Sequence, residues 1–278
     1  MPNRNFSCLS LVLALLGLTF SGLGIPSALS MDVFLDFENP TTLGVARTDP
    51  KGEEIVFEVC ETLTGSSEHR AVGEGSLFVT TPNHRGLQLP LENPILKPLA
   101  GEIEAMTLAC WIRLPGDSDR SGFLIAGRSY RASGAKSESR AEFLRRPGVW
   151  RFALHEKQGL WFFLGGNTTR VNTQGSFATA DFPLEEWVHL AVTYAAGEVT
   201  FYVNGQTVHN SVMSGGATKI EALQDGGLEG VLSIGSNPGY AYRGLRINSQ
   251  LDDFAFFGSR ALNPDEIAVL YEAGSSKK

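Results

Sequence analysis

One segment of the chain constrains its fold more than any other. In residues 187–194 and 199–203, apolar side chains recur at every second position. This alternation on β-branched and aromatic residues predicts two β-strands, each with one face in a core. Residues 195–198 predict a short turn. Asn204-Gly205 predicts a second tight hairpin, because both central positions of a type I′ turn need positive φ. An antiparallel meander must bury its apolar face, so the rest of the chain is expected to supply a second layer.

Short strand-like segments separated by turn signals run through the rest of the chain. Their spacing of about 8–12 residues is typical of a β-sandwich or jelly roll. The expected strands cover residues 32–38, 54–59, 76–80, 86–91, 106–114, 123–126, 149–154, 159–164, 231–234 and 251–257. The sequence therefore predicts an all-β chain folded as an antiparallel β-sandwich.

One helix is predicted, in the segment 262–274 near the end of the chain. Asn263 is a good N-cap, Pro264 suits the first helical position, and Glu266 completes a capping box with Asn263. Gly274 is expected to end the helix. The apolar side of the helix is expected to pack against a sheet.

The first thirty residues are typical of a secretory signal peptide. Arg4 is their only charged residue, residues 9–20 form an apolar run, and small residues precede a cut before Met31. The run is too short to span a bilayer, which disfavours an uncleaved anchor; a start at Met31 is the other alternative. The sequence predicts a signal peptide over 1–30, a single domain over 31–278, and a secreted, periplasmic or cell-surface protein without a membrane span.

The net charge limits the possible partners of the protein, and the cysteine content limits its possible disulfides. The formal net charge of −7 disfavours nucleic acid as a partner. Cys8 belongs to the predicted signal peptide, which leaves Cys60 and Cys110. In an oxidising compartment these two thiols either form one disulfide or are two small buried hydrophobes, and the sequence leaves both alternatives open.

No segment carries a recognisable catalytic pattern. Glu102 and Glu104 are expected in an exposed loop, and a strand would direct Asp252 and Asp253 to opposite faces. His189 has no partner close in sequence and is expected to be a hydrogen-bonded core residue. The sequence therefore predicts a protein without enzymatic activity.

Two loops are candidates for ligand binding. The segment 128–151 carries seven basic residues with two aromatic residues, Tyr130 and Trp150, that could stack on a sugar ring. Guanidinium groups bind carboxylate or sulfate in pairs of hydrogen bonds, so an anionic polysaccharide is the predicted ligand. The alternative is a solvated loop. The expected contact residues are Arg128, Tyr130, Arg145 and Arg146, and in the second loop, over 237–246, Tyr240, Tyr242 and Arg243. The alternative for the second loop is an ordinary connection. The other tryptophans, Trp111, Trp161 and Trp187, are expected in the core.

Four segments taken in order, 106–115, 186–208, 232–239 and 251–274, resemble the laminin G-like, concanavalin A-like jelly-roll family, and its bacterial secreted branch in particular. The resemblance implies two stacked antiparallel sheets. It also implies one Ca²⁺ at the sandwich rim, with Asp36 and Asp252 as candidate ligands. The alternative for Asp252 is a hydrogen bond within a turn.

The fold of that family serves lectins, glycanases and adhesion modules alike. The predicted function is non-catalytic binding of carbohydrate. A protein-interaction or cell-surface structural domain is the first alternative, and a glycoside hydrolase is the second.

Overall fold

The computed structural model describes residues 32–35, 37, 45–49, 53–56, 58–59, 63–66, 76–79, 86–94, 96–116, 123–130, 146–155, 159–166, 169–173, 177, 182–224, 230–235 and 249–275. Asp36, Cys60, Arg145, Tyr240, Tyr242 and Arg243 lie outside these residues, as does the predicted signal peptide.

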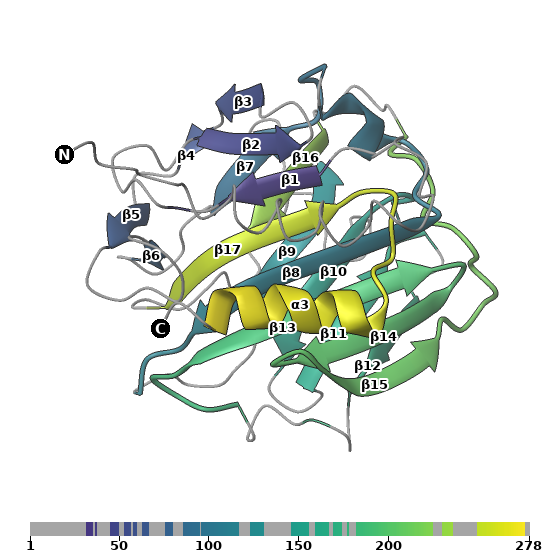
Figure 1. Ribbon diagram of the computed structural model, residues 1–278. Helices are drawn as coiled ribbons and strands as arrows, with labels where there is room; N and C mark the ends of the chain where they lie inside the picture. The colour runs from purple at the N-terminus through teal and green to yellow at the C-terminus, as the bar shows by residue number, and fades with distance from the viewer. Residues whose placement is uncertain are drawn as a thin grey trace, which may run out of the picture.

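The chain forms two antiparallel sheets stacked as a β-sandwich (Figure 1). The first has ten strands, eight of them in the order β15-β14-β13-β8-β17-β1-β2-β3, while β6 pairs with β17 and β5 with β6. Their bounds are β1 (Asp32–Leu35), β2 (Val45–Asp49), β3 (Glu53–Val56), β5 (Leu63–Ser66), β6 (Ser76–Val79), β8 (Ala105–Arg113), β13 (Trp187–Ala195), β14 (Glu198–Val203), β15 (Gln206–Val212) and β17 (Gln250–Phe257).

The second sheet has seven strands in the order β12-β11-β10-β9-β16-β7-β4. Their bounds are β4 (Glu58–Val59), β7 (Leu87–Pro90), β9 (Phe123–Tyr130), β10 (Trp150–His155), β11 (Gly159–Leu164), β12 (Thr169–Asn172) and β16 (Gly230–Ile234). A short 3₁₀ helix, η1 (Lys97–Ala100), precedes β8. The predicted all-β sandwich is confirmed.

The central meander forms as its sequence predicts. Strands β13, β14 and β15 pair antiparallel in consecutive order. Ala196 and Gly197 have φ of 48° and 88°, and Asn204 and Gly205 have φ of 49° and 75°. Both connections therefore place two residues in the left-handed region, as a two-residue type I′ hairpin requires.

Several strand predictions need correction. The expected strand over 54–59 is two strands, β3 and β4, which belong to different sheets. β2, β5 and β12 were not predicted, because their sequences are short, polar and without clear alternation. β9 continues to Tyr130, four residues beyond the predicted strand.

The main core lies between the two sheets. It is lined by the inward residues of every long strand, among them Cys110, Trp150, Phe162 and Phe201. Strand β8 is central: it lies between β13 and β17, and seven of its nine residues are buried. Within the described part of the chain, no helix is long and apolar enough to cross a membrane.

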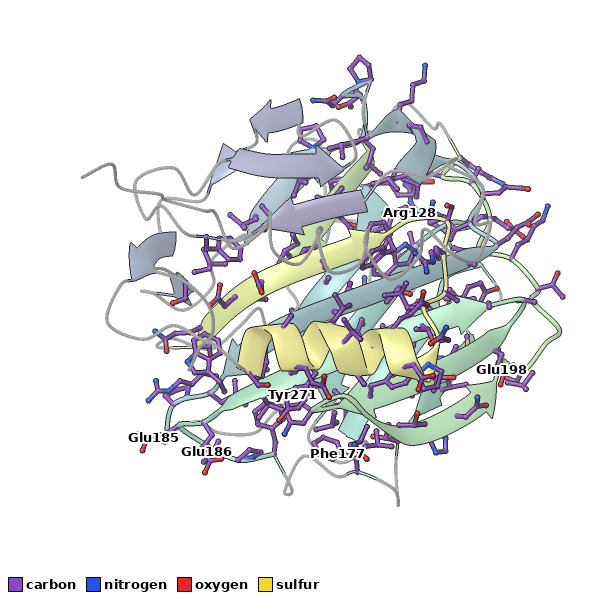
Figure 2. The ribbon with its side chains drawn as sticks, in the orientation of Figure 1. Arg128, Phe177, Glu185, Glu186, Glu198 and Tyr271 are labelled. Atoms are coloured by element: carbon purple, nitrogen blue, oxygen red, sulfur yellow. The ribbon has the colours of Figure 1, made fainter. Side chains whose placement is uncertain are left out.

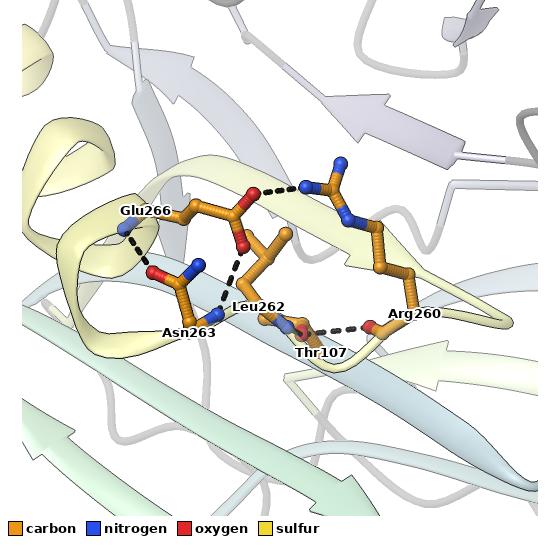
Figure 3. A network of polar contacts seen from close by, with 5 residues as sticks. All are labelled: Thr107, Arg260, Leu262, Asn263 and Glu266. Atoms are coloured by element: carbon orange, nitrogen blue, oxygen red, sulfur yellow. Dashed lines mark hydrogen bonds and ion pairs between the residues drawn. The ribbon is translucent and has the colours of Figure 1, made fainter. Parts of the chain in front are cut away.

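The helix α3 (Pro264–Ser275) lies across the outer face of the ten-stranded sheet (Figure 1). Small residues make room for it, because Ala109, Ala191 and Ala255 belong to the same buried cluster as Ile267 of the helix. The predicted capping box is confirmed. The amide of Asn263 donates to Glu266 Oε2 at 2.9 Å, and the amide of Glu266 donates to Asn263 Oδ1 at 3.0 Å (Figure 3).

Gly274 does not end α3 as predicted, because the helix continues to Ser275. Instead it lets the helix approach the sheet closely. A Cβ atom at Gly274 would lie 2.4 Å from Nε1 of Trp111, which is closer than non-bonded atoms can come. Gly274 therefore serves the packing of the helix on the sheet.

Candidate functional site

A row of three side chains crosses the outer face of the ten-stranded sheet near the C-terminal end of α3. Arg113 on β8 lies opposite Trp187 on β13 and Gln250 on β17. Residues that are directly opposite in neighbouring strands share a face, so the three side chains lie side by side. We call Arg113, Glu185, Trp187, Gln250 and Tyr271 the Trp187 patch.

The centre of the patch is aromatic. Trp187 and Tyr271 are both partly exposed, and both pack against Trp111, which is 1% exposed. The rings of Trp111 and Tyr271 are stacked, with centroids 5.5 Å apart. Figure 2 shows Tyr271 below α3 and Glu185 and Glu186 at the lower left of the view. The patch thus presents two aromatic rings on a buried aromatic base.

The polar groups of the patch are held by hydrogen bonds. Arg113 Nη1 donates to Gln250 Oε1 at 3.1 Å, and Arg113 Nε donates to the carbonyl of Glu185 at 3.0 Å. Glu185 has φ of 63° and its amide donates to the carbonyl of Leu114 at 2.7 Å. A glutamate in the left-handed region is uncommon, and here it joins the start of β13 to the end of β8.

His189 lies next to the patch and beneath α3. Its ring centroid is 5.3 Å from that of Trp111 and 6.0 Å from that of Tyr271. The side chain is 2% exposed, and Nδ1 has no hydrogen-bond partner. Burial lowers the pKa of His189 to about 3, so the imidazole is neutral at pH 7. The predicted burial is confirmed, but Nδ1 is not hydrogen-bonded.

The prediction that Arg128 contacts a ligand is wrong. The residue is 1% exposed, and its guanidinium donates to the carbonyls of Leu99, Gly101, Gly148 and Glu221 at 2.5–2.7 Å. Desolvation lowers the pKa of Arg128 to about 9, which still leaves it charged at pH 7. Four backbone acceptors occupy the side chain, so it serves the fold.

The prediction that Tyr130 contacts a ligand is also wrong. The residue is 3% exposed, and its hydroxyl donates to the carbonyl of Gln224 at 3.0 Å. The guanidinium of Arg146 lies 4.9 Å from the centre of the Tyr130 ring, in cation–π contact. Arg146 is partly exposed, so of the predicted loop residues that the structure describes it is the one that a ligand could reach.

The sequence suggests that Trp150 could stack on a sugar ring, but the structure rules this out. Trp150 is fully buried between the sheets, with its ring 5.6 Å from Phe256 and 6.1 Å from Phe162. Trp111 and Trp161 are buried as expected. Trp187 is only partly buried, and it lies on the outer face of the sheet.

Of the two residues that the resemblance predicts to bind calcium, Asp36 and Asp252, the structure describes Asp252. Asp252 is fully buried, and its Oδ1 accepts a hydrogen bond from the amide of Asp253 at 2.8 Å. Leu35, the neighbour of Asp36, pairs with Phe254, two residues from Asp252. Among the residues that the structure describes, no group of three or more histidine, cysteine, aspartate and glutamate side chains could hold a metal ion. Asp252 accepts a local backbone hydrogen bond, but this bond lies at the bulge of β17 rather than in a turn as the alternative predicted.

Cys110 is a free thiol, buried in β8. This agrees with the alternative that it acts as a small hydrophobe. Glu102 and Glu104 are exposed, as the sequence predicted, and Glu102 forms an ion pair with Lys219 at 2.6 Å.

The Trp187 patch was not predicted, although the sequence contains a signal for it. The same alternation that places Val188 and Leu190 in the core places Trp187 and His189 on the opposite face. In β8, Trp111 and Arg113 occupy that outer face by the same rule. The prediction that Trp187 lies in the core did not follow this alternation and was wrong.

No curated protein sequence matches the chain. Two of the solved structures that share its fold are an arabinanase domain and a neurotoxin binding domain. One is domain 4 of AbnA, an extracellular GH43 arabinanase from Geobacillus stearothermophilus, in complex with arabinotriose. It has 12% identity and a TM-score of 0.54, and the match covers 87% of this chain and 98% of that domain. The other is the binding domain of botulinum neurotoxin serotype D. It has 14% identity and a TM-score of 0.53, and the match covers 87% of this chain and 51% of that one.

Likeness at these identities establishes the architecture alone. A comparison of the sequence with family models identifies the family of the chain. The family model described as the concanavalin A-like lectin/glucanases superfamily, Laminin_G_3, matches residues 87–268, from β7 into α3. The matched range holds the strands β7 to β17, which come from both sheets, and every residue of the Trp187 patch except Tyr271. The chain therefore belongs to the concanavalin A-like lectin/glucanases superfamily.

Proposed function

We propose that this protein is a non-catalytic carbohydrate-binding domain and that the Trp187 patch holds its ligand. One observation carries the proposal: the partly exposed rings of Trp187 and Tyr271 pack on the same buried tryptophan, Trp111. Aromatic rings offer large apolar faces at small entropic cost, and the apolar face of a sugar ring packs on such surfaces.

The polar groups beside the rings suit sugar hydroxyl groups. Arg113 is partly exposed and is fixed by its hydrogen bond to the buried Gln250, and the side chains of Glu185 and Glu186 are exposed at the start of β13. Groups that are already held in place lose little entropy on binding, which favours affinity. The structural likeness to an arabinanase domain solved with arabinotriose supports carbohydrate as the ligand class.

The test is binding of the purified protein to a panel of polysaccharides that includes arabinan, followed by isothermal titration with the best ligand. We expect Trp187→Ala to weaken binding about fivefold to thirtyfold, because a stacked aromatic contact contributes on the order of 1–2 kcal/mol. Tyr271→Phe keeps the ring and should bind like wild type, whereas Tyr271→Leu should bind weakly.

Val212→Ala is the matched control. Val212 is 71% exposed on β15 and lies opposite Glu198, at the other end of the strands from Trp187. If the Trp187→Ala variant melts at the wild-type temperature and binds every ligand as wild type does, the Trp187 patch is not the carbohydrate-binding site. Release of reducing ends from a bound polysaccharide would show a glycoside hydrolase instead.

Calcium and an extracellular location are part of the same proposal. The burial of Asp252 and the pairing of Leu35 with Phe254 favour a metal role for Asp36 and Asp252. If calcium is bound there, the melting temperature should fall when a chelator is added and recover with excess Ca²⁺, and Asp252→Asn should remove that dependence.

The signal-like residues 1–30 support secretion or display at the cell surface.

A further inference from the structure

The C-terminal half of α3 covers a histidine that is not part of the main core. His189 projects from β13 on the outer face of the sheet, away from the residues that fill the space between the sheets. Its side chain is 2% exposed because Trp111 lies on one side of it and Tyr271 of α3 on another. Water could therefore reach this imidazole if only the helix end moved, with the sandwich intact.

The buried imidazole has no compensating polar contact at Nδ1. The elements packed around it bring few charges near it. The charged or titratable groups on the same face of the neighbouring elements are Tyr271 on α3, Tyr202 on β14, Arg113 on β8, and Asp252 on β17 beyond Trp111. Asn204, which follows β14, bonds only the backbone of His189, through its side chain and its amide. A protonated imidazole in this position would be a buried charge without a paired anion, which is strongly unfavourable.

The two ends of α3 are attached to the sheet in different ways. At the N-terminal end, Thr107 Oγ1 donates to the carbonyl of Arg260 at 2.9 Å and accepts from the amide of Leu262 at 2.8 Å (Figure 3). Arg260 also forms an ion pair with Glu266, and Ile267 is fully buried. At the C-terminal end, the contacts to the sheet include the ring of Tyr271 against Trp111 and Gly205, the backbone of Gly274 against Trp111, and the side chain of Leu270 against the cluster that holds Ala109 and Ala191.

We propose that protonation of His189 releases the C-terminal half of α3 from the ten-stranded sheet while the N-terminal half stays attached. The helix end leaves because an imidazolium is stable only in contact with water. The strand stays because His189 keeps its backbone bonds to Asn204 and because the main core lies on the other side of the sheet.

The size of the effect follows from the proton balance. In the released state the imidazole is solvated and has an ordinary pKa of about 6.5. In the attached state burial holds its pKa near 3, so it stays neutral through this range. The released fraction therefore rises about tenfold for each pH unit below 6.5. This change depends only on His189, and no sugar is needed for it.

Hydrogen exchange of the full-length protein tests the proposal. Protection factors, corrected for the intrinsic pH dependence of exchange, are measured between pH 7 and pH 4.5. We expect the protection of amides 270–275 to fall about tenfold per pH unit below 6.5, while amides in β13 and β14 keep theirs. In His189→Phe, which keeps an aromatic ring and cannot titrate, the protection of 270–275 should not depend on pH.

His189→Gln, also without a titrating group, replaces His189→Phe if that variant folds poorly. His209→Gln is the matched control, because His209 lies on β15 and its ring contacts Phe201 of the main core. An unchanged pH dependence in both His189 variants would overturn the proposal. Equal loss of protection in β13 and in α3 would overturn it too, since that pattern means global unfolding. Neither result depends on whether the Trp187 patch binds carbohydrate.

Discussion

At the scale of single residues, Arg128 shows how a charged side chain can hold several loops together. Its guanidinium connects β9 to η1, to Gly148 and to Glu221, which lies 93 residues away in the sequence. Each bond from a charged donor to a carbonyl contributes more than a neutral one, and leaving buried carbonyls unpaired is costly. The arginine is buried because backbone acceptors surround it.

We predict that Arg128→Met lowers the free energy of unfolding by about 3 kcal/mol or more, because two buried and two partly buried hydrogen bonds to carbonyls lose their donor. Urea denaturation followed by far-UV circular dichroism measures the loss. Arg146→Ala is the control: Arg146 is partly exposed over the ring of Tyr130, and removing it should cost no more than about 1 kcal/mol. Similar losses in the two variants would contradict the structural role of Arg128.

At the scale of elements, the attachment of α3 depends on one hydroxyl group. Thr107 on β8 bonds both the carbonyl of Arg260 and the amide of Leu262, just before the helix begins (Figure 3). The capping box of Asn263 and Glu266 then starts the helix. The direction in which the chain leaves β17 and enters α3 is therefore set by side-chain to backbone bonds.

We predict that Thr107→Val destabilises the protein by about 1–3 kcal/mol, because it preserves volume and leaves a buried backbone donor and acceptor unpaired. Thr193→Val is a matched control, because Thr193 lies directly opposite Thr107 on β13 and is 6% exposed. That change should cost less than about 0.5 kcal/mol. Thermal unfolding of the two variants compares them, and equal shifts in melting temperature would count against the hydroxyl as the anchor of α3.

The elements with strong local signals were predictable, and those held by distant contacts were not. Alternation gave β8, β13 and β14, Asn204-Gly205 gave a hairpin, and Asn263 with Glu266 gave the start of α3. β2, β5 and β12 carry no such pattern, because a short strand is held by its neighbours more than by its own sequence. The division of residues 53–59 between two sheets is likewise a property of the whole fold.

At the scale of the whole molecule, the same separation of local and distant information explains the candidate site. Composition and charge cannot tell whether an arginine is exposed, so Arg128 and Arg146 looked alike in the sequence although the structure buries the first. The Trp187 patch needs three strands in register and a helix placed across them. The parity of each strand can be read locally, but the side-by-side order of β13, β8 and β17 cannot.

The whole sandwich also keeps two weak acids protonated, which makes its stability sensitive to alkali. Cys110 and Tyr194 both face the main core. Burial raises the pKa of the Cys110 thiol above its ordinary value of 9.0, and raises that of Tyr194 to about 12. Above pH 9 the unfolded chain releases a proton that the folded protein keeps. Folding stability contributed by the neutral thiol is therefore complete below pH 9 and is lost as the pH rises beyond it.

We predict that the free energy of unfolding falls between pH 9 and pH 10 by an amount that includes about 1 kcal/mol from Cys110, whose thiol in the unfolded chain is already half ionised at pH 9. Cys110→Ala should be less stable at pH 7, because it leaves a small cavity, but its decrease over this range should be smaller by that amount. Urea denaturation in the presence of a reductant measures both quantities. Tyr194→Phe is the control: it should keep the slope between pH 9 and pH 10 and lose part of the further decrease above pH 10. If Cys110→Ala and wild type share one slope, the thiol ionises in the folded protein as it does in the unfolded chain, and the centre of the sandwich is not as dry as its packing implies.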